Sequence, residues 1–257
     1  MTALEHTSTE VIRIGVLTPH AALGPEAELP AMAPGRVVTC VARVSAEEDA
    51  FEAHWAIPSG ARALITVPLL DGPAELLGQS ALDLTVYAST SSGYALGHDT
   101  ELAVVSRLSR RIEMQVVSTC ISAVLALRVL DVGRIALVHP PWFDDELNEL
   151  GSAYFGSQGF DVVSSASAPL SLDPRRIEPA AVFEWTSRHV ADDADAVFIG
   201  GNGFRAAGAI AALEDALDRP VLTSNQVLLW NVVRHARVAF EVTGYGRLFA
   251  SERSGES

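Results

Sequence analysis

The chain has 257 residues, of which 49% are hydrophobic and 19% are charged. This composition is apolar enough for one or two packed cores, and it excludes a disordered chain. The net charge of −14 at pH 7 argues against nucleic acid or an anionic membrane as a partner, because non-specific binding to either needs a basic surface.

Targeting and membrane signals are missing from the sequence. The stretch Met1–Glu10 lacks the basic and apolar regions of a signal peptide. The longest apolar runs, such as Ile121–Leu127, are too short to span a bilayer. Two cysteines, Cys40 and Cys120, are too few for a disulfide framework or a cysteine-rich metal site. We therefore expect a cytoplasmic protein.

Short apolar or β-branched runs alternate along the chain with helical patterns. Turn residues or helix caps bound each run, which is typical of strands buried in a parallel sheet. The predicted strands are Val11–Thr18, Arg36–Ala42, Ala63–Val67, Asp83–Ala88, Glu113–Val117, Arg134–Val138, Phe160–Ser164, Asp195–Ile199 and Pro220–Leu222.

Helices are predicted between these strands from apolar periodicity and cap residues. Ser45 and Glu48 are spaced as in a capping box, and Asp173 followed by Pro174 is a typical helix start. One predicted helix begins at Ser45, and another follows Gly93 and continues to about Arg111. Further helices are predicted at Cys120–Leu130, Asp144–Tyr154, Pro174–Val190 and Arg205–Leu217. The last predicted helix runs from its cap, Thr223–Asn225, to about Arg237.

Alternating strands and helices predict an α/β fold with parallel sheets covered on both faces. Two βα series of similar length predict two lobes, made of residues 1–117 plus 224–257 and residues 118–223. Ligands of such sheets bind beyond the carboxyl ends of the strands. Those ends carry polar or glycine-rich segments, as a binding cleft needs, and they are Pro19–His20, Ser89–Ser91, Ser118–Cys120, Pro141–Trp142, Gly201–Gly203 and Thr223–Asn225.

Five stretches, in order and spacing, resemble one known family. They are Arg13–Pro19, Tyr87–Ser91, Ala123–Arg128 with Arg134–Leu137, Asp195–Ile199 with Phe204–Arg205, and Pro220–Gln226 with Trp230. Over roughly residues 11–236 the chain resembles the aspartate/glutamate racemase superfamily, closest to its maleate isomerase and arylmalonate decarboxylase branch. The resemblance implies two pseudo-symmetric doubly wound lobes with the active site in the cleft between them. It also implies a homo-oligomer, a small carboxylic acid as substrate, and no metal or organic cofactor.

The chain departs from this family at the catalytic thiols. Racemases and isomerases of the family use one cysteine from each lobe, and the decarboxylases use one. The first cysteine position corresponds to Ser89, and the second to Gly201, or to Asn202 if the loop is shifted by one residue. An unassisted serine hydroxyl is a far poorer base or nucleophile than a thiolate. Either other groups do the chemistry, or the site only binds.

Three residues are candidates for handling a proton, and each has a purely structural alternative. His20 follows the first strand and titrates near neutrality, although it is equally well explained as an exposed turn residue. Cys120 begins a helix, where a thiol pKa falls, but a small buried side chain is the simpler reading. Cys40 lies inside a strand and is expected to be buried. Ser89 is the third candidate.

The expected substrate-binding residues lie at strand ends that feed helix N-termini, where backbone N–H groups favour an anion. The alternative is that these hydroxyl and amide groups only cap helices. Trp142 is expected to wall an apolar pocket or to pack in the core. The expected binding residues are Thr90, Ser91, Trp142, Gly201, Asn202, Thr223 and Asn225.

Other chemistries are excluded by their missing motifs. Gly200–Gly203 lacks the Lys-Ser/Thr of a phosphate loop, and no metal-ligand spacing is present. We therefore expect a cofactor-independent isomerase, racemase or decarboxylase that moves a proton next to a carboxylate. A catalytically lapsed carboxylate-binding protein, and a lyase or hydratase on the same scaffold, remain open alternatives.

Overall fold

The computed structural model describes residues 11–19, 23–44, 69–236 and 240–250. The helix predicted to open at Ser45 and the strand predicted at Ala63–Val67 lie outside these ranges, as does His20. Among the helices of the described ranges, none is both long enough and apolar enough to cross a membrane.

The first half of the chain builds a parallel four-stranded sheet. Its order is β2 (Val37–Arg43), β1 (Ile12–Thr18), β3 (Leu84–Tyr87) and β4 (Val116–Ser118). The first strand pairs with both neighbours, so β1 and β3 form the centre of the sheet. The helices of this half are α1 (Pro25–Met32), α3 (Asp71–Gly78), α4 (Thr90–Leu96), α5 (His98–Ile112) and α6 (Thr119–Val129).

The second half repeats this plan. Its sheet has the order β6 (Asp161–Ser167), β5 (Arg134–His139), β7 (Ala196–Ile199) and β8 (Val221–Thr223), again all parallel. Both sheets place the second strand of their half at one edge, then the first, third and fourth. The helices of this half are α7 (Asp145–Ser157), η2 (Pro174–Arg176), α8 (Pro179–His189), η3 (Asn202–Phe204), η4 (Ala207–Ala209), α9 (Ile210–Leu217), α10 (Ser224–Ala236) and α11 (Arg247–Ala250). The predicted α/β fold with two pseudo-symmetric, parallel lobes is confirmed.

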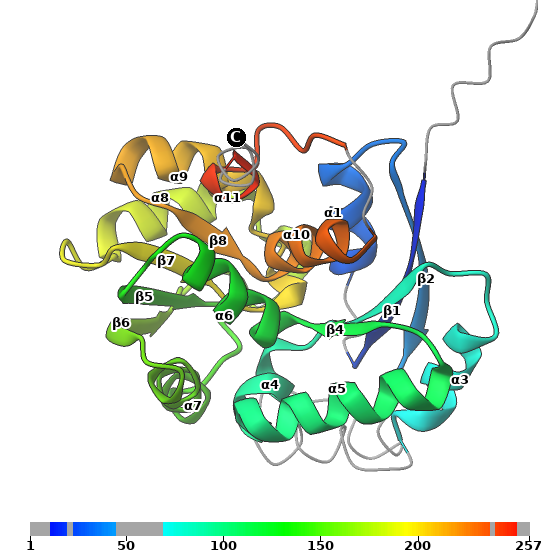
Figure 1. The fold of residues 1–257 in the computed structure, drawn as a ribbon. Helices are drawn as coiled ribbons and strands as arrows, with labels where there is room; N and C mark the ends of the chain where they lie inside the picture. The colour runs from blue at the N-terminus through cyan, green and yellow to red at the C-terminus, as the bar shows by residue number, and fades with distance from the viewer. Residues whose placement is uncertain (1–10, 20–22, 45–68, 237–239, 251–257) are drawn as a thin grey trace, which may run out of the picture.

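Helix α10 lies between the two sheets (Figure 1) and belongs to both hydrophobic cores. Val227 and Trp230 pack in the core of the second sheet, while Leu228 and Leu229 pack in the core of the first. The side chain of Asn231 donates a hydrogen bond to Ser122 of α6, which joins α10 to the helix that follows β4. The assignment of residues 224–257 to the first lobe stays a prediction.

The described strands match their predicted positions with small shifts at their ends. Strand β6 ends at Ser167 instead of Ser164, and β4 begins at Val116 instead of Glu113. Glu113 has a left-handed backbone, with φ of 52°, and ends helix α5. A residue used as the left-handed cap of a helix cannot at the same time be extended as a strand.

Two predicted helices are shorter than the sequence suggests. The helix predicted at Pro174–Val190 is split into η2 and α8, because Glu178 precedes Pro179 and is held in an extended conformation, with φ of −99° and ψ of 147°. The helix predicted to start at Arg205 begins instead at Ile210. Arg205 itself has φ of 51°, outside the helical range.

The prediction that Cys40 is buried is wrong. Cys40 is exposed, whereas Cys120 is completely buried. Among the described strands, β2 pairs with β1 alone and forms an edge of the sheet, and Val38, two residues before Cys40, is also 51% exposed. One face of this strand therefore leaves its side chains in contact with solvent.

The difference in exposure between Cys40 and Cys120 predicts the alkylation pattern of the folded protein. Iodoacetamide should label Cys40 and spare Cys120, because Cys120 is inaccessible and its burial also raises the pKa of its thiol. Peptide mass spectrometry after labelling would show one modified cysteine, and denaturation before labelling should expose both. Alkylation of Cys120 in the folded protein would contradict the burial described here.

Candidate active site

Polar side chains from both sheets meet where the strands end. Thr90 begins α4 after β3, Thr119 begins α6 after β4, Asn202 follows β7, and Ser224 and Asn225 begin α10 after β8. All five are buried. We call these five residues the strand-end cluster. Two of its members come from the first half of the chain and three from the second, so the cluster joins the two sheets.

Asn202 is the centre of this cluster. Its side-chain oxygen accepts hydrogen bonds from the backbone N–H and the hydroxyl of Thr90, both at 3.0 Å. Its amide nitrogen donates to Asn225 Oδ1 at 2.9 Å and to Thr119 Oγ1 at 3.1 Å. The Thr90 hydroxyl also lies 2.9 Å from that of Ser224. One amide side chain thus holds the starts of three helices in register.

A partly buried carboxylate, Glu28 of α1, adjoins the cluster. Its oxygens accept hydrogen bonds from Asn225 Nδ2 at 2.7 Å and from the backbone N–H of Ala207 at 2.9 Å. Burial raises the pKa of Glu28, and these two hydrogen bonds partly oppose that rise. Asn225 Nδ2 also donates to the backbone oxygen of Asn202. Both donors of the Asn225 amide are therefore engaged by the protein.

Ser89, the predicted first thiol position, is the N-cap of α4. Its hydroxyl accepts a hydrogen bond from the backbone N–H of Ser92 at 3.3 Å and donates to Ser92 Oγ at 2.7 Å. Ser91 is also buried, in the first turn of the same helix. Ser89 is thus fixed in place directly before Thr90 of the strand-end cluster.

Thr223 caps α10. Its hydroxyl accepts from the backbone N–H of Gln226 at 3.4 Å, and its own backbone N–H donates to Gln226 Oε1 at 3.1 Å. This reciprocal pair is a capping box. The observed contacts of Thr223 are therefore those of a helix cap, which is the structural alternative to ligand binding. The role of Thr223 as an anion ligand stays a prediction.

The loop that carries the predicted second thiol position is tightly constrained. Gly201 has φ of 92°, and a Cβ built on it would lie 2.8 Å from Pro140 Cγ. Its backbone N–H donates to Thr90 Oγ1 at 3.1 Å. Three residues later, Phe204 packs edge-on against Trp142, with ring centroids 6.1 Å apart. Trp142 is half-buried and packs against the hydrophobic cores of the second sheet, so its role as the wall of a pocket stays a prediction.

Cys120 lies next to the cluster but is poorly suited to be a thiolate. Its Sγ is 3.5 Å from the backbone oxygen of Thr90. Burial raises the thiol pKa well above its ordinary value, and the nearby Glu101 carboxylate raises it further. These effects oppose the lowering that a helix N-terminus gives. Cys120 therefore stays a protonated thiol at neutral pH.

A buried histidine that sequence reasoning did not single out lies beneath the Gly200–Gly201 loop. His139, at the end of β5, is hydrogen bonded to the hydroxyl of Tyr94 at 3.1 Å and to Asn148 Oδ1 at 2.6 Å. Burial lowers its pKa to about 4, so the ring is neutral at pH 7. A Cβ on Gly200 would lie 2.8 Å from the ring. The His139 ring therefore packs against the Gly200–Gly201 loop.

Of the predicted site residues, the structure brings Thr90, Asn202 and Asn225 into direct contact and places Ser89, Gly201 and Cys120 beside them. Glu26 of α1 pairs with Arg43 of β2. Sequence reasoning missed Glu28, two residues further on. Nothing in the local sequence distinguishes a partly buried glutamate on a short helix from an exposed one. In the described part of the chain, no group of acidic, histidine and cysteine side chains could hold a metal ion.

Comparison with known proteins places this geometry in a family. A model of the arylmalonate decarboxylase family matches residues 71–249. Among curated protein sequences, none matches the chain. The fold is shared with several solved structures at low sequence identity, and two kinds of enzyme occur among them.

An unliganded arylmalonate decarboxylase has a TM-score of 0.76 at 20% identity, over 93% of this chain and 99% of that one. A maleate cis-trans isomerase from Nocardia farcinica, bound to TRIS, has a TM-score of 0.80 at 21% identity, over 95% and 100% of the two chains. A variant of the maleate isomerase from Pseudomonas putida with maleate has a TM-score of 0.77 at 20% identity, over 94% and 98%.

Gly201→Ala should destabilise the protein by about 1–3 kcal/mol, because any side chain there meets both a left-handed backbone and Pro140. The matched control is Gly72→Ala, since Gly72 lies in α3 with open space around its Cβ. That change should be neutral or slightly stabilising. Urea unfolding of both variants measures the difference. Equal stabilities would mean that the Gly201 loop is not constrained.

Asn202→Ala should lower the free energy of unfolding by about 2–5 kcal/mol, because it leaves buried groups of Thr90, Thr119 and Asn225 without their partner. The control is Gln79→Ala at the exposed end of α3, where a change of less than about 0.5 kcal/mol is expected. Chemical denaturation compares the two. A loss below about 1 kcal/mol for Asn202→Ala would refute the central place of this amide.

Proposed function

The chain belongs to the arylmalonate decarboxylase family of enzymes, and from this premise we propose that it decarboxylates a small malonate-type dicarboxylic acid without a cofactor. The product is the corresponding monocarboxylic acid. The substrate class follows from the family description, and the choice of decarboxylation over isomerisation or racemisation follows from the groups present in the site.

The observation that carries this proposal is the kind of acid and base available. Cys120 is buried with a raised thiol pKa, Cys40 is exposed on an edge strand, and the position expected to hold the first thiol carries the hydroxyl of Ser89. Racemisation needs a base strong enough to remove a proton from carbon, and a serine hydroxyl is a poor one. Decarboxylation needs only a proton donor after CO2 has left. A hydroxyl serves as a donor to a carbanion-like carbon.

The proposed reaction proceeds in two steps. The bond between the α-carbon and one carboxylate breaks, CO2 leaves, and the electron pair is delocalised into the remaining carboxyl group as an enediolate. Ser89 then donates its hydroxyl proton to the α-carbon and is reprotonated in turn. Ser91 and the hydroxyl of Thr223 hold the remaining carboxyl group in this proposal, because the backbone N–H and the hydroxyl of Thr90 already donate to Asn202 and the backbone N–H of Thr223 donates to Gln226.

Two aromatic side chains beside the Gly201 loop also favour decarboxylation. Trp142 and Phe204 pack beside the Gly201 loop. An apolar wall excludes water from a leaving carboxylate and favours the less charged CO2. We propose that these rings also contact the substituent on the α-carbon of the substrate. The predictions of a homo-oligomer and of a cytoplasmic location rest on the sequence alone.

One observation favours a second candidate, a carboxylate-binding protein without turnover. The side-chain amides of Asn202 and Asn225 donate their hydrogen bonds to each other, to Thr119 and to Glu28. Such internal satisfaction is typical of a structural cluster. In that case Asn202 and Asn225 do not contact the ligand, and only the hydroxyl and backbone groups beside them do.

The two candidates differ in turnover. We expect CO2 release from at least one of malonate, methylmalonate or phenylmalonate, and neither isomerisation of maleate nor racemisation of aspartate. Ser89→Ala should reduce kcat by about 10²–10⁴-fold with little change in KM, the usual effect of losing a proton donor. Coupled CO2 detection and chiral chromatography follow these reactions.

The control for Ser89→Ala is Asp144→Ala, because Asp144 is likewise an N-cap, accepting from the backbone N–H of Leu147 at 2.9 Å. Both variants lose a helix cap, and both should lose about 1 kcal/mol of stability. Only Ser89→Ala should lose turnover. Binding of these acids by calorimetry without any turnover would replace the decarboxylase with the binding protein.

A further inference from the structure

Three buried side-chain oxygens on β3, β4 and α5 have no hydrogen-bond partner among the described residues. They are Tyr87 Oη, Glu101 Oε1 and Ser118 Oγ. Tyr87 and Ser118 are paired in register on β3 and β4, so their side chains leave the same face of the sheet. Buried polar atoms are nearly always hydrogen bonded, and the usual partner where the protein offers none is an internal water molecule.

Glu101 of α5 is the charged member of this group and is completely buried. Its second oxygen, Oε2, accepts a hydrogen bond from the hydroxyl of Tyr154 on α7. Oε1 lies close to Gly93, where a Cβ would approach it to 3.1 Å. Its carboxylate also faces Ser118 and the first backbone N–H groups of α6, at Cys120 and Ile121. The unpaired oxygen therefore points toward the end of β4.

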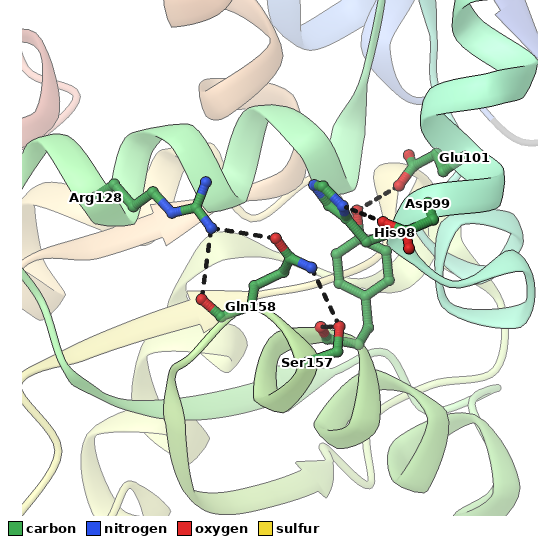
Figure 2. Close-up of polar contacts among 7 residues, drawn as sticks. His98, Asp99, Glu101, Arg128, Ser157 and Gln158 are labelled. Carbon is green, nitrogen blue, oxygen red and sulfur yellow. Dashed lines mark hydrogen bonds and ion pairs between the residues drawn. The ribbon is translucent and has the colours of Figure 1, made fainter.

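Figure 2 shows Glu101 together with polar contacts of the helices near it. At the start of α5, His98 Nδ1 lies 3.5 Å from Asp99 Oδ1, close to Glu101. On the opposite side, Arg128 of α6 donates to the side chain and backbone of Gln158, at the end of α7. The Arg128–Gln158 contact joins α6 to α7, and the hydrogen bond from Tyr154 to Glu101 joins α7 to α5.

The hydroxyl groups of Ser92 and Tyr87 connect Ser89 with this region. The Ser89 hydroxyl donates to Ser92 Oγ at 2.7 Å. Both serines approach the Tyr87 hydroxyl closely enough to lower its pKa, although neither is within hydrogen-bond geometry of it. Hydroxyl groups thus lead from Ser89 through Ser92 to Tyr87, the first of the unpaired oxygens.

We propose that one internal water molecule, held by Tyr87, Ser118 and Glu101, completes a proton relay from Glu101 to Ser89. The inference rests on the proposed function, in which Ser89 gives its proton to the α-carbon. Glu101 touches neither substrate nor reacting atoms, so it is a positioning residue that acts through Ser89.

The relay balances over one turnover. The Ser89 oxygen, left as an alkoxide, takes a proton from Ser92, to which it is hydrogen bonded. Ser92 takes a proton from Tyr87 once its side chain turns toward that hydroxyl, because the two groups are not hydrogen bonded at rest. Tyr87 takes a proton from the water, and the water takes one from the carboxyl group of Glu101. Each hydroxyl loses one proton and gains one. The net change is one proton moved from Glu101 to the product, and Glu101 recovers it from solvent before the next turnover.

The ionisation of Glu101 fits this task. Burial raises its pKa to about 7, against the lowering effect of Tyr154, Ser118 and two backbone N–H groups. The other titratable groups that face it are Tyr87 of β3, Tyr94 of α4, Cys120 of α6 and Tyr154 of α7. The pKa of each of these is raised, so they stay protonated near neutrality. His98 packs edge-on against the ring of Tyr154 from the other side.

The pH dependence of turnover tests the relay. Glu101 donates only when protonated, so kcat should be level below about pH 7 and fall toward tenfold per pH unit above it. Glu101→Gln should lower kcat by about 10–10²-fold below pH 7, remove this fall, and leave KM unchanged. Glu101→Asp, which keeps the carboxyl group, should partly restore both the rate and the fall.

Two controls separate the relay from a structural role. Glu149→Gln makes the same chemical change at an exposed position of α7 and should change nothing. His98→Gln tests the nearest imidazole and should leave the pH profile intact. If Glu101 only caps α6, Glu101→Gln would alter stability while keeping the pH-dependent fall in kcat, and that result would overturn the proposal.

Tyr87→Phe removes only a hydroxyl that has no protein partner. With the relay, kcat should fall by about tenfold or more at unchanged KM. Without it, turnover should be unaffected and the protein at least as stable, because a buried unpaired group has been deleted. This variant keeps the inference testable even if Glu101→Gln folds poorly.

A final measurement does not depend on turnover. Infrared difference spectra, with Glu101→Gln as the reference, give the titration of the Glu101 carboxyl group, and Tyr87→Phe, Ser118→Ala and Ser89→Ala should each shift it. A crystal structure at high resolution should show a water within about 3.2 Å of the three oxygens. No water there, or a titration indifferent to Ser89, would overturn the relay. Absence of decarboxylation with both of these results positive would instead overturn only the proposed function.

Discussion

The side chain of Asn202 is the interaction on which the rest of the site depends. A single buried amide accepts from Thr90 and donates to Thr119 and Asn225, so it connects segments that follow β3, β4 and β8. An amide is suited to this place because it offers two donors and an acceptor without a charge. No pairing between the described strands joins the two sheets, and this cluster, with helix α10, fixes how their carboxyl ends face each other.

Fixing the strand ends also decides which chemistry is possible. Ser89 and Gly201 stand where the resemblance places two thiols, and the buried Cys120 keeps its proton. Gly201 has neither the backbone angle nor the space for a side chain. A site built this way can donate a proton more readily than it can remove one from carbon. The proposed decarboxylation and the proposed role of Glu101 both follow from that asymmetry.

Sequence reasoning located the segments of the candidate site but misjudged several of its side chains. Burial of Cys40 was inferred from its strand, yet an edge strand exposes one face. Glu28 and Glu101 look like ordinary helix glutamates in the sequence, yet segments far along the chain cover Glu101 completely and Glu28 in part. Tyr154, for example, lies 53 residues beyond the Glu101 that it contacts. Such distant contacts have no local signature.

The sequence by itself determined the alternation of strands and helices, the polar segments at the strand ends and the family, because apolar periodicity, cap residues and turn residues act locally. The break before Pro179 and the left-handed Arg205 were local features that the apolar pattern concealed. Only the tertiary structure decided which polar groups meet, which carboxylates are buried and which oxygens are left without partners. Burial and pKa depend on what surrounds a side chain in space, and the chain order does not contain that information.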